Sequence, residues 1–139
     1  MLLYDHPSSL SEPLIERLIH TFYGRVRKDP LIGPIFEERL AGRWDVHLAK
    51  MVDFWSSIAL RSGRYFGRPH IAHQNLGLEP LHFQRWLALF EETARAVCDE
   101  ASAEFFIDRS QRIADSLQIG LNIGPKALRF AVRSASAGG

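Results

Sequence analysis

The sequence predicts a single all-α domain, and three observations support this fold class. Apolar residues recur at helical spacing along most of the chain, and no segment shows the sustained two-residue alternation of a half-buried strand. Prolines and glycines fall between these periodic segments, where helices are expected to end. A chain of 139 residues with 46% hydrophobic composition is long enough for one compact core and one modest cavity.

The first helix is expected to begin after Ser11, a residue type that commonly caps helix N-termini, with Pro13 in the first turn. The Asp29-Pro30 pair is expected to end it. Its apolar face repeats at a spacing of four and contains Leu14, Ile15, Leu18, Ile19, Phe22, Tyr23 and Val26. Residues 31–36 are interrupted by a glycine and a proline, and we interpret this segment as a turn with a helical corner.

Four further helices are expected along the rest of the chain. A long one should cover residues 44–60, and a loop rich in glycine and arginine follows over residues 62–69. A short helix is expected to begin after Pro69 and to end near Gly77. Pro80 should open another long helix, and the last should begin near Ser102. We expect residues 1–123 to form the domain and residues 124–139, which are rich in alanine, serine and glycine, to form a tail outside the core.

Composition disfavours several classes of protein. Seventeen basic and sixteen acidic residues are spread along the chain and give a net charge of +1, whereas nucleic-acid binding needs concentrated positive charge. Cys98 is the single cysteine and cannot form an internal disulfide, which is typical of proteins from a reducing compartment. No signal peptide or membrane-spanning segment is recognisable, so we expect a cytoplasmic protein that binds neither nucleic acid nor membrane. Its oligomeric state is left open.

Four residues call for more than a packing explanation. His47 shares a helical face with Met51 and Phe54, so it should point toward the core or its margin; on its own it favours a core histidine with a satisfied hydrogen bond. Tyr23 lies at the end of an apolar face, and its hydroxyl needs a partner if buried, most commonly a backbone carbonyl. Trp86 lies centrally on its helix and carries a nitrogen that only donates. His73 lies in the short segment before the third long helix.

Metal sites without haem fit the histidine spacing poorly. His70 and His73 share a helical face, but two histidines do not fill a zinc site, and no further ligand lies near them in sequence. A di-iron bundle needs two Glu-x-x-His motifs, and the chain has only Glu79-x-x-His82. No nucleophile elbow, phosphate loop or dinucleotide-binding glycine motif is present. A helical domain with one available histidine and an apolar slot can instead bind haem.

Residues 10–122 contain four ordered blocks, and with these blocks the chain resembles the group III truncated haemoglobins. The blocks are Phe22-Tyr23-x-x-Val26-Arg27-x-Asp29-Pro30-x-x-Gly33-Pro34-Ile35-Phe36, Trp44-x-x-His47-x-x-Lys50-x-x-x-Phe54-Trp55, Gly63-x-Tyr65-x-Gly67-x-Pro69-x-x-x-His73 and Phe83-x-x-Trp86-Leu87-x-Leu89-Phe90-Glu91-Glu92. Four blocks with matching separations make the resemblance specific. The glycine pairs of other truncated-haemoglobin groups are absent, as expected of group III.

The resemblance implies a truncated globin fold, a two-over-two helical sandwich around haem b (iron protoporphyrin IX). By position, His73 matches the proximal histidine that coordinates iron. Tyr23, His47 and Trp86 match residues that face the bound gas. The positions that match residues lining the haem plane are Phe36, Met51 and Phe54. Around the haem propionates, the candidates are Arg64, Tyr65, Arg68 and His70.

The function expected from this resemblance is binding of a diatomic gas, with oxygen ahead of carbon monoxide and nitric oxide. A polar pocket also suits activation of the bound gas, so a peroxidase-like or nitric oxide dioxygenase activity, supplied with electrons by a reductase, is the alternative. A gas sensor ranks lower because sensors usually couple to a further domain. A helical interaction module without haem would be the outcome if the resemblance were misleading.

Overall fold

A computed structural model describes residues 9–65, 67, 69–74 and 76–124, with the side chains of residues 70 and 71 excepted. Within these residues the regular secondary structure is α-helical throughout. The helices are α1 (Glu12–Lys28), α2 (Gly33–Leu40), α3 (Trp44–Leu60), α4 (Pro69–Ala72), α5 (Pro80–Val97) and α6 (Glu100–Gly120). The predicted all-α class is confirmed. Apart from Gly124, the predicted tail lies outside the described residues.

Both predicted ends of the first helix are confirmed. The Ser11 hydroxyl accepts a hydrogen bond from the backbone N–H of Leu14 at 3.3 Å, which satisfies one of the unpaired donors of the first turn. At the other end, the backbone N–H of Asp29 donates to Val26 and closes α1. The predicted apolar face is buried over most of its length, from Ile15 to Val26.

Residues 31–36 were expected to form a turn with a helical corner, and the structure has a turn at residues 30–32 followed by a helix that is longer than a corner, α2. Gly33 and Pro34 start this helix rather than interrupt it. A proline in the first turn loses no helical hydrogen bond, since its missing N–H would have no partner within the helix. A side chain at Gly33 would meet the carbonyl oxygens of Val26 and Arg27 at 2.9 and 3.0 Å. The glycine therefore lets α2 begin directly against the end of α1.

The remaining helices differ from the prediction mainly at their ends. Helix α4 is four residues long and ends at Ala72, well before Gly77. Helix α5 begins at Pro80 as predicted. Helix α6 begins at Glu100, slightly earlier than expected, because the carboxylate of Asp99 accepts from the backbone N–H of Ser102 at 2.9 Å and caps the helix.

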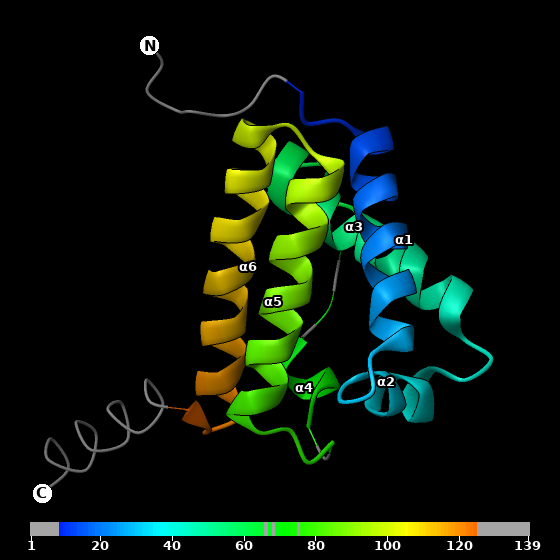
Figure 1. Ribbon diagram of the computed structural model, residues 1–139, viewed down its shortest axis with the longest axis vertical. Coiled ribbons are helices and arrows are strands. Elements are labelled where there is room, and N and C mark those ends of the chain that lie inside the picture. The colour runs from blue at the N-terminus through cyan, green and yellow to red at the C-terminus, as the bar shows by residue number, and fades with distance from the viewer. Residues whose placement is uncertain (1–8, 66, 68, 75, 125–139) are drawn as a thin grey trace, which may run out of the picture.

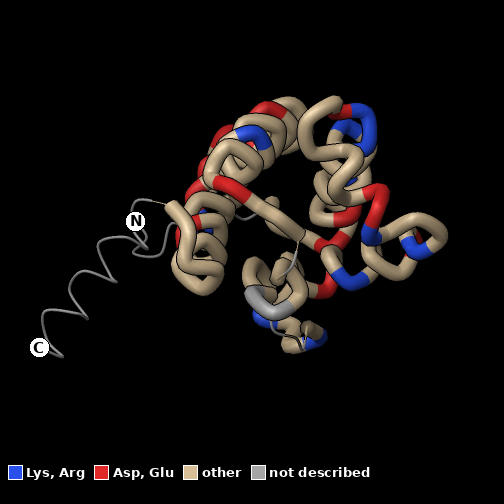
Figure 2. Tube along the Cα trace, turned by 90° about the horizontal axis from the view of Figure 1, so that it is seen from below, with Lys and Arg blue, Asp and Glu red and all other residues tan. Residues whose placement is uncertain are grey.

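The four long helices enclose one core. Helices α5 and α6 lie side by side and antiparallel, α1 packs against α5, and α3 crosses behind them and contacts α1 (Figure 1). Phe22, Phe90 and Phe106 are fully buried at the centre, and Trp55 stacks on Phe90 with ring centres 5.1 Å apart. Acidic and basic residues are distributed over several helices (Figure 2). None of the described helices is both long and apolar enough to cross a membrane.

Candidate functional site

A cavity of about 360 Å³ opens between the helices, and it contains most of the residues that the sequence singled out. Its volume lies in the range typical of small-molecule sites, roughly 300–1,000 Å³. All long helices contribute to its wall, together with α2, α4 and the segments that flank α4. The predicted site residues that line it are Tyr23, Phe36, His47, Met51, Phe54, Tyr65, His73 and Trp86.

His73 lies just after α4, and its ring is fixed by the helix that precedes it. The Nδ1 atom lies 2.6 Å from the carbonyl oxygen of Pro69, and the backbone N–H of His73 donates to the same oxygen at 3.2 Å. A carbonyl oxygen only accepts, so Nδ1 must carry the proton. In the neutral ring the lone pair then lies on Nε2, which is the arrangement a metal-ligating histidine requires.

Tyr23 lies on α1 at another part of the cavity wall, and its side chain is almost completely buried, with 4% exposed. Burial raises the pKa of this phenol well above its usual value, and a hydrogen bond with the Trp86 indole opposes the rise without reversing it. The phenol therefore keeps its proton at physiological pH. Because an indole nitrogen only donates, the Tyr23 oxygen accepts in this bond, and its own proton is not used there.

His47 projects from α3 beside Tyr23, with ring centres 5.0 Å apart in an edge-to-face arrangement. Its Nε2 atom is buried and has no hydrogen-bond partner in the described part of the chain. Burial, followed by electrostatic interactions with His73 and Lys50, lowers the pKa of His47 to about 4, so the ring is neutral at physiological pH. An unpaired buried polar atom costs about 1–3 kcal/mol. The interpretation of His47 as a core histidine with a satisfied hydrogen bond is therefore wrong for this atom.

Trp86 completes the polar group from α5. Its indole stacks on Phe90 with ring centres 5.4 Å apart and an angle of 11° between the planes, and it meets the edge of Phe22 at 5.5 Å. These contacts with fully buried rings hold the indole between the core and the cavity. The cavity thus combines a phenol, an indole and an imidazole from three long helices with a second imidazole from the segment after α4.

Arg64 is not brought to the cavity. Its guanidinium group binds both carboxylate oxygens of Glu12 at 2.9 and 3.0 Å and the carboxylate of Asp53 at 2.8 Å. These bonds raise the pKa of Arg64 and lower that of Glu12. The arginine thereby ties the loop after α3 to the start of α1. Of the other residues predicted near the propionates, Arg68 lies outside the described residues, as does the side chain of His70.

Sequence reasoning missed several cationic or polar side chains that line the same cavity. Lys50 follows His47 by three residues and so shares its helical face, a spacing that could have revealed it. Arg39 reaches across from α2 and donates to the backbone carbonyl of Gln74 at 3.3 Å, a contact with no signal in the sequence. His82 accepts from the backbone N–H of Glu79 through Nδ1 at 2.9 Å, which directs Nε2 elsewhere. Arg43 also lines the wall.

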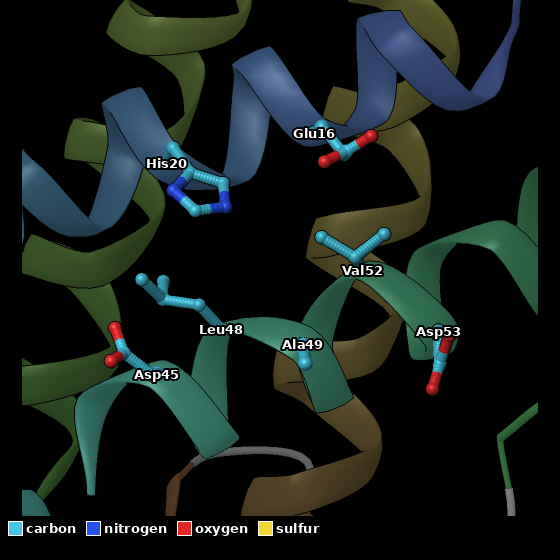
Figure 3. A pocket seen from close by; sticks show the side chains of 7 residues that line it. All are labelled: Glu16, His20, Asp45, Leu48, Ala49, Val52 and Asp53. Atoms are coloured by element: carbon cyan, nitrogen blue, oxygen red, sulfur yellow. The ribbon is translucent and has the colours of Figure 1, made fainter.

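A second hollow lies on the other side of α3, between this helix and α1, and it holds none of the predicted site residues. Figure 3 shows its wall, to which α1 contributes Glu16 and His20 while α3 contributes Asp45, Leu48, Ala49, Val52 and Asp53. Among the described residues, no set of three or more histidine, cysteine or acidic side chains is arranged to hold a metal ion. The chemistry predicted from the sequence is therefore gathered in the first cavity.

Comparisons with known proteins give one relative and one structure, both from Campylobacter jejuni. The chain is 35% identical over 114 residues to the group 3 truncated haemoglobin Ctb, an overlap of 79% of this chain and 90% of that protein. It is also similar to the crystal structure of a group III truncated haemoglobin, with a TM-score of 0.76 and 34% identity over 83% of this chain and 94% of the other. No family model matches the chain.

Proposed function

The chain belongs to the group III truncated haemoglobins, and we propose that it holds haem b through His73 and binds a diatomic gas, foremost oxygen, on the opposite side of the haem. The observation that carries this proposal is the state of His73. Its Nδ1 proton is committed to the Pro69 carbonyl, which leaves the Nε2 lone pair available for iron. This lone pair belongs to the same cavity as Tyr23 and His47.

The chain's own residues fit a haem group in three respects. His73 offers the single nitrogen ligand that globins use on the proximal side. Phe36, Met51 and Phe54 give the cavity apolar walls suited to a porphyrin plane. Among the described residues, the buried Nε2 atom of His47 has no hydrogen-bond partner, so it is available to a ligand or a ligand-bound water. Haem, when bound, supplies the iron position at which a gas can coordinate.

In this proposal, Tyr23 is the principal donor to the gas. Its hydroxyl accepts from Trp86 and keeps its own proton for an acceptor in the cavity. His47 is neutral, so it can present either an N–H or a lone pair, and it lies within contact distance of Tyr23. Oxygen ligands carry partial negative charge and gain from such donors, whereas carbon monoxide gains less.

At the edge of the haem, the proposal assigns the propionates to Tyr65, which lines the cavity, and to Arg68 and His70. Arg64 would contribute only by leaving Glu12 and Asp53, to which it makes three hydrogen bonds. We also propose residues 1–123 as the haem domain and the cytoplasm as the location. No role is assigned to residues 124–139.

A second candidate function is enzymatic, either peroxidase-like or the oxidation of nitric oxide by oxygen, with a reductase as electron donor. The observation that favours it is the polar character of the cavity, in which the phenol of Tyr23 and the imidazole of His47 can both donate and the indole of Trp86 supports the phenol. Several donors polarise a bound O–O bond more than reversible carriage requires. Consumption of nitric oxide by the oxygen-saturated protein, measured over many turnovers, separates this candidate from simple binding. A sensor role ranks last.

The test of haem binding is a pair of histidine variants. The purified protein should show an intense Soret band with about one haem per chain. His73→Gly should lose haem or bind it weakly, and added imidazole should partly restore the spectrum. His20→Ala, which changes an exposed histidine in the hollow between α1 and α3 and away from the cavity, should leave the spectrum unchanged. A normal histidine-ligated ferrous spectrum in His73→Gly would show that the iron ligand is another residue.

A further inference from the structure

A buried carboxylate joins three helices beside the cavity. Asp29 ends α1, and only 2% of its side chain is exposed. Its carboxylate accepts from the backbone N–H groups of Leu31 and Ile32, both at 3.0 Å, and from Nε of Arg85 on α5 at 2.6 Å. Its backbone oxygen accepts from the N–H of Gly33, the first residue of α2, at 2.9 Å. The end of α1, the start of α2 and the start of α5 therefore meet at one residue.

Two of these three helices, α1 and α5, carry the phenol and the indole of the cavity. Tyr23 lies on α1, six residues before Asp29, and Trp86 follows Arg85 directly on α5. Helix α2 contributes Phe36, whose ring lies against Tyr23 with centres 5.7 Å apart. Any sliding of α5 along α1 would change the separation of the Tyr23 phenol and the Trp86 indole. Sub-ångström positioning of this kind can alter the energy of a hydrogen bond considerably.

The Asp29–Arg85 pair is suited to resist such sliding. Burial of Asp29 opposes its ionisation, but the hydrogen bonds from Ile32, Arg85 and Leu31 outweigh this and hold the pKa of the carboxyl below its usual value. Two of its partners lie in the turn before α2 and the third comes from α5, so a displacement of α5 would leave a buried carboxylate insufficiently compensated. A second ion pair between α1 and α5, Arg25 with Glu92 at 3.2 Å, is exposed, and exposed pairs constrain little.

We propose that Asp29 and Arg85 are positioning residues that set the place of the Trp86 indole relative to the Tyr23 phenol, and through it the strength with which the cavity retains oxygen. This inference rests on the proposed function, since it assigns the two residues a role in binding of the same gas. Neither residue lines the cavity. Their effect is therefore exerted through the two donors and is separate from direct contact with the gas.

The experiment compares Asp29→Asn and Arg85→Gln with Glu92→Gln, which breaks the exposed pair between the same two helices. Oxygen release from the ferrous protein should quicken by about two- to tenfold in the first two variants, the range expected for coupled neighbours. The C–O stretching frequency of the carbon monoxide complex should rise, and the indole N–H resonance of Trp86 in that complex should move. Glu92→Gln should match the wild type in all three. Arg85→Lys should retain part of the wild-type behaviour.

A double variant tests whether the effect passes through Trp86. On a Trp86→Phe background, Arg85→Gln should add almost nothing to the rate of oxygen release. Arg85 is nearly half exposed, so its variants should fold even if Asp29→Asn does not. If the Arg85 and Asp29 variants only lower the melting temperature, and the indole resonance, the C–O stretch and the release rate stay unchanged, the pair has a purely structural role. This result would overturn the inference and leave the proposed function standing. A wild-type protein without a Soret band would overturn the proposed function as well.

Discussion

Replacing Tyr23 with phenylalanine tests how the cavity retains its ligand, because it removes one hydroxyl and little else. The ring is 4% exposed and packs against Phe22, Phe36 and His47 with centres 4.8, 5.7 and 5.0 Å apart. A phenylalanine ring keeps these contacts. The substitution therefore isolates the proposed hydrogen bond from the packing that surrounds it.

The size of the effect follows from the bond that is lost and the bond that can replace it. A hydrogen bond to a charged partner contributes about 1.5–3 kcal/mol, which corresponds to roughly a ten- to 150-fold change in rate. In the wild type the Trp86 indole donates to the Tyr23 oxygen. Removing that oxygen frees the indole to donate to the gas instead. We therefore expect oxygen release to quicken by about tenfold, near the lower limit, and carbon monoxide release to change much less.

Stopped-flow measurement of oxygen release provides the assay, with a matched control in the other tyrosine of the cavity. Tyr65 also lines the cavity, but we assign it to the haem edge, so Tyr65→Phe should release oxygen at nearly the wild-type rate. Tyr23→Phe combined with Trp86→Phe should exceed the sum of the two single effects on the free energy, because each donor partly replaces the other. An unchanged rate in both single variants would refute the polar-pocket mechanism and leave haem binding untouched.

Three further outcomes are expected. His47→Leu should leave the haem-free protein at least as stable as the wild type, because the variant has no buried nitrogen that needs a partner. With haem, an effect on gas association alone would indicate gating. A change from low-spin to high-spin ferric iron would indicate ligation, and unchanged spectra and rates would exclude both. Burial lowers the pKa of His47 to about 4 from an ordinary 6.5, so between these values the unfolded chain binds a proton that the folded chain does not. The haem-free wild type should therefore lose stability as pH falls from 6.5 to 4, as measured by denaturation at a series of pH values. His47→Leu should lose less over the same interval. The Asp29 carboxyl has a lowered pKa, so its contribution is present above the ordinary value of 3.8 and is lost as pH falls below it; acid titration of Asp29→Asn should show a shallower loss, and an identical acid limb would contradict this.

The helices were predictable where local signals decide the outcome. Periodic apolar faces and a capping serine were sufficient for α1, and Pro80 marked the start of α5. The length of α2 was missed because Gly33 and Pro34 are read as breakers from sequence, so only a helical corner was expected. Whether such a pair ends a helix or begins one depends on what lies beside it, and here the end of α1 approaches too closely for any side chain at Gly33.

The residues of the cavity were predictable as a set, but the hydrogen bonds and ion pairs that they form were not. Tyr23, His47, His73 and Trp86 come from distant parts of the chain, and only the family resemblance grouped them. Three features depend on tertiary structure: the bond from Trp86 to Tyr23, the unpaired nitrogen of His47 and the engagement of Arg64 by two carboxylates. No spacing in the sequence encodes which of several nearby acidic groups an arginine will bind.

The cavity contains one group with a free lone pair, His73, and one group with a free proton, Tyr23. Hydrogen bonds within the protein fix both states. The Pro69 carbonyl keeps the proton of His73 on Nδ1 and so leaves a lone pair on Nε2. The Trp86 indole bonds to the oxygen of Tyr23 and so leaves the phenol its proton. A haem held by Nε2 of His73 would supply the iron position for the gas, and the proton of Tyr23 would stabilise bound oxygen more than bound carbon monoxide. Burial raises the pKa of Tyr23 and lowers that of His47 to about 4, so neither side chain changes charge near neutral pH. The stabilisation of bound oxygen by Tyr23 and His47, measured as the rate of oxygen release, should therefore be constant between about pH 6 and 8.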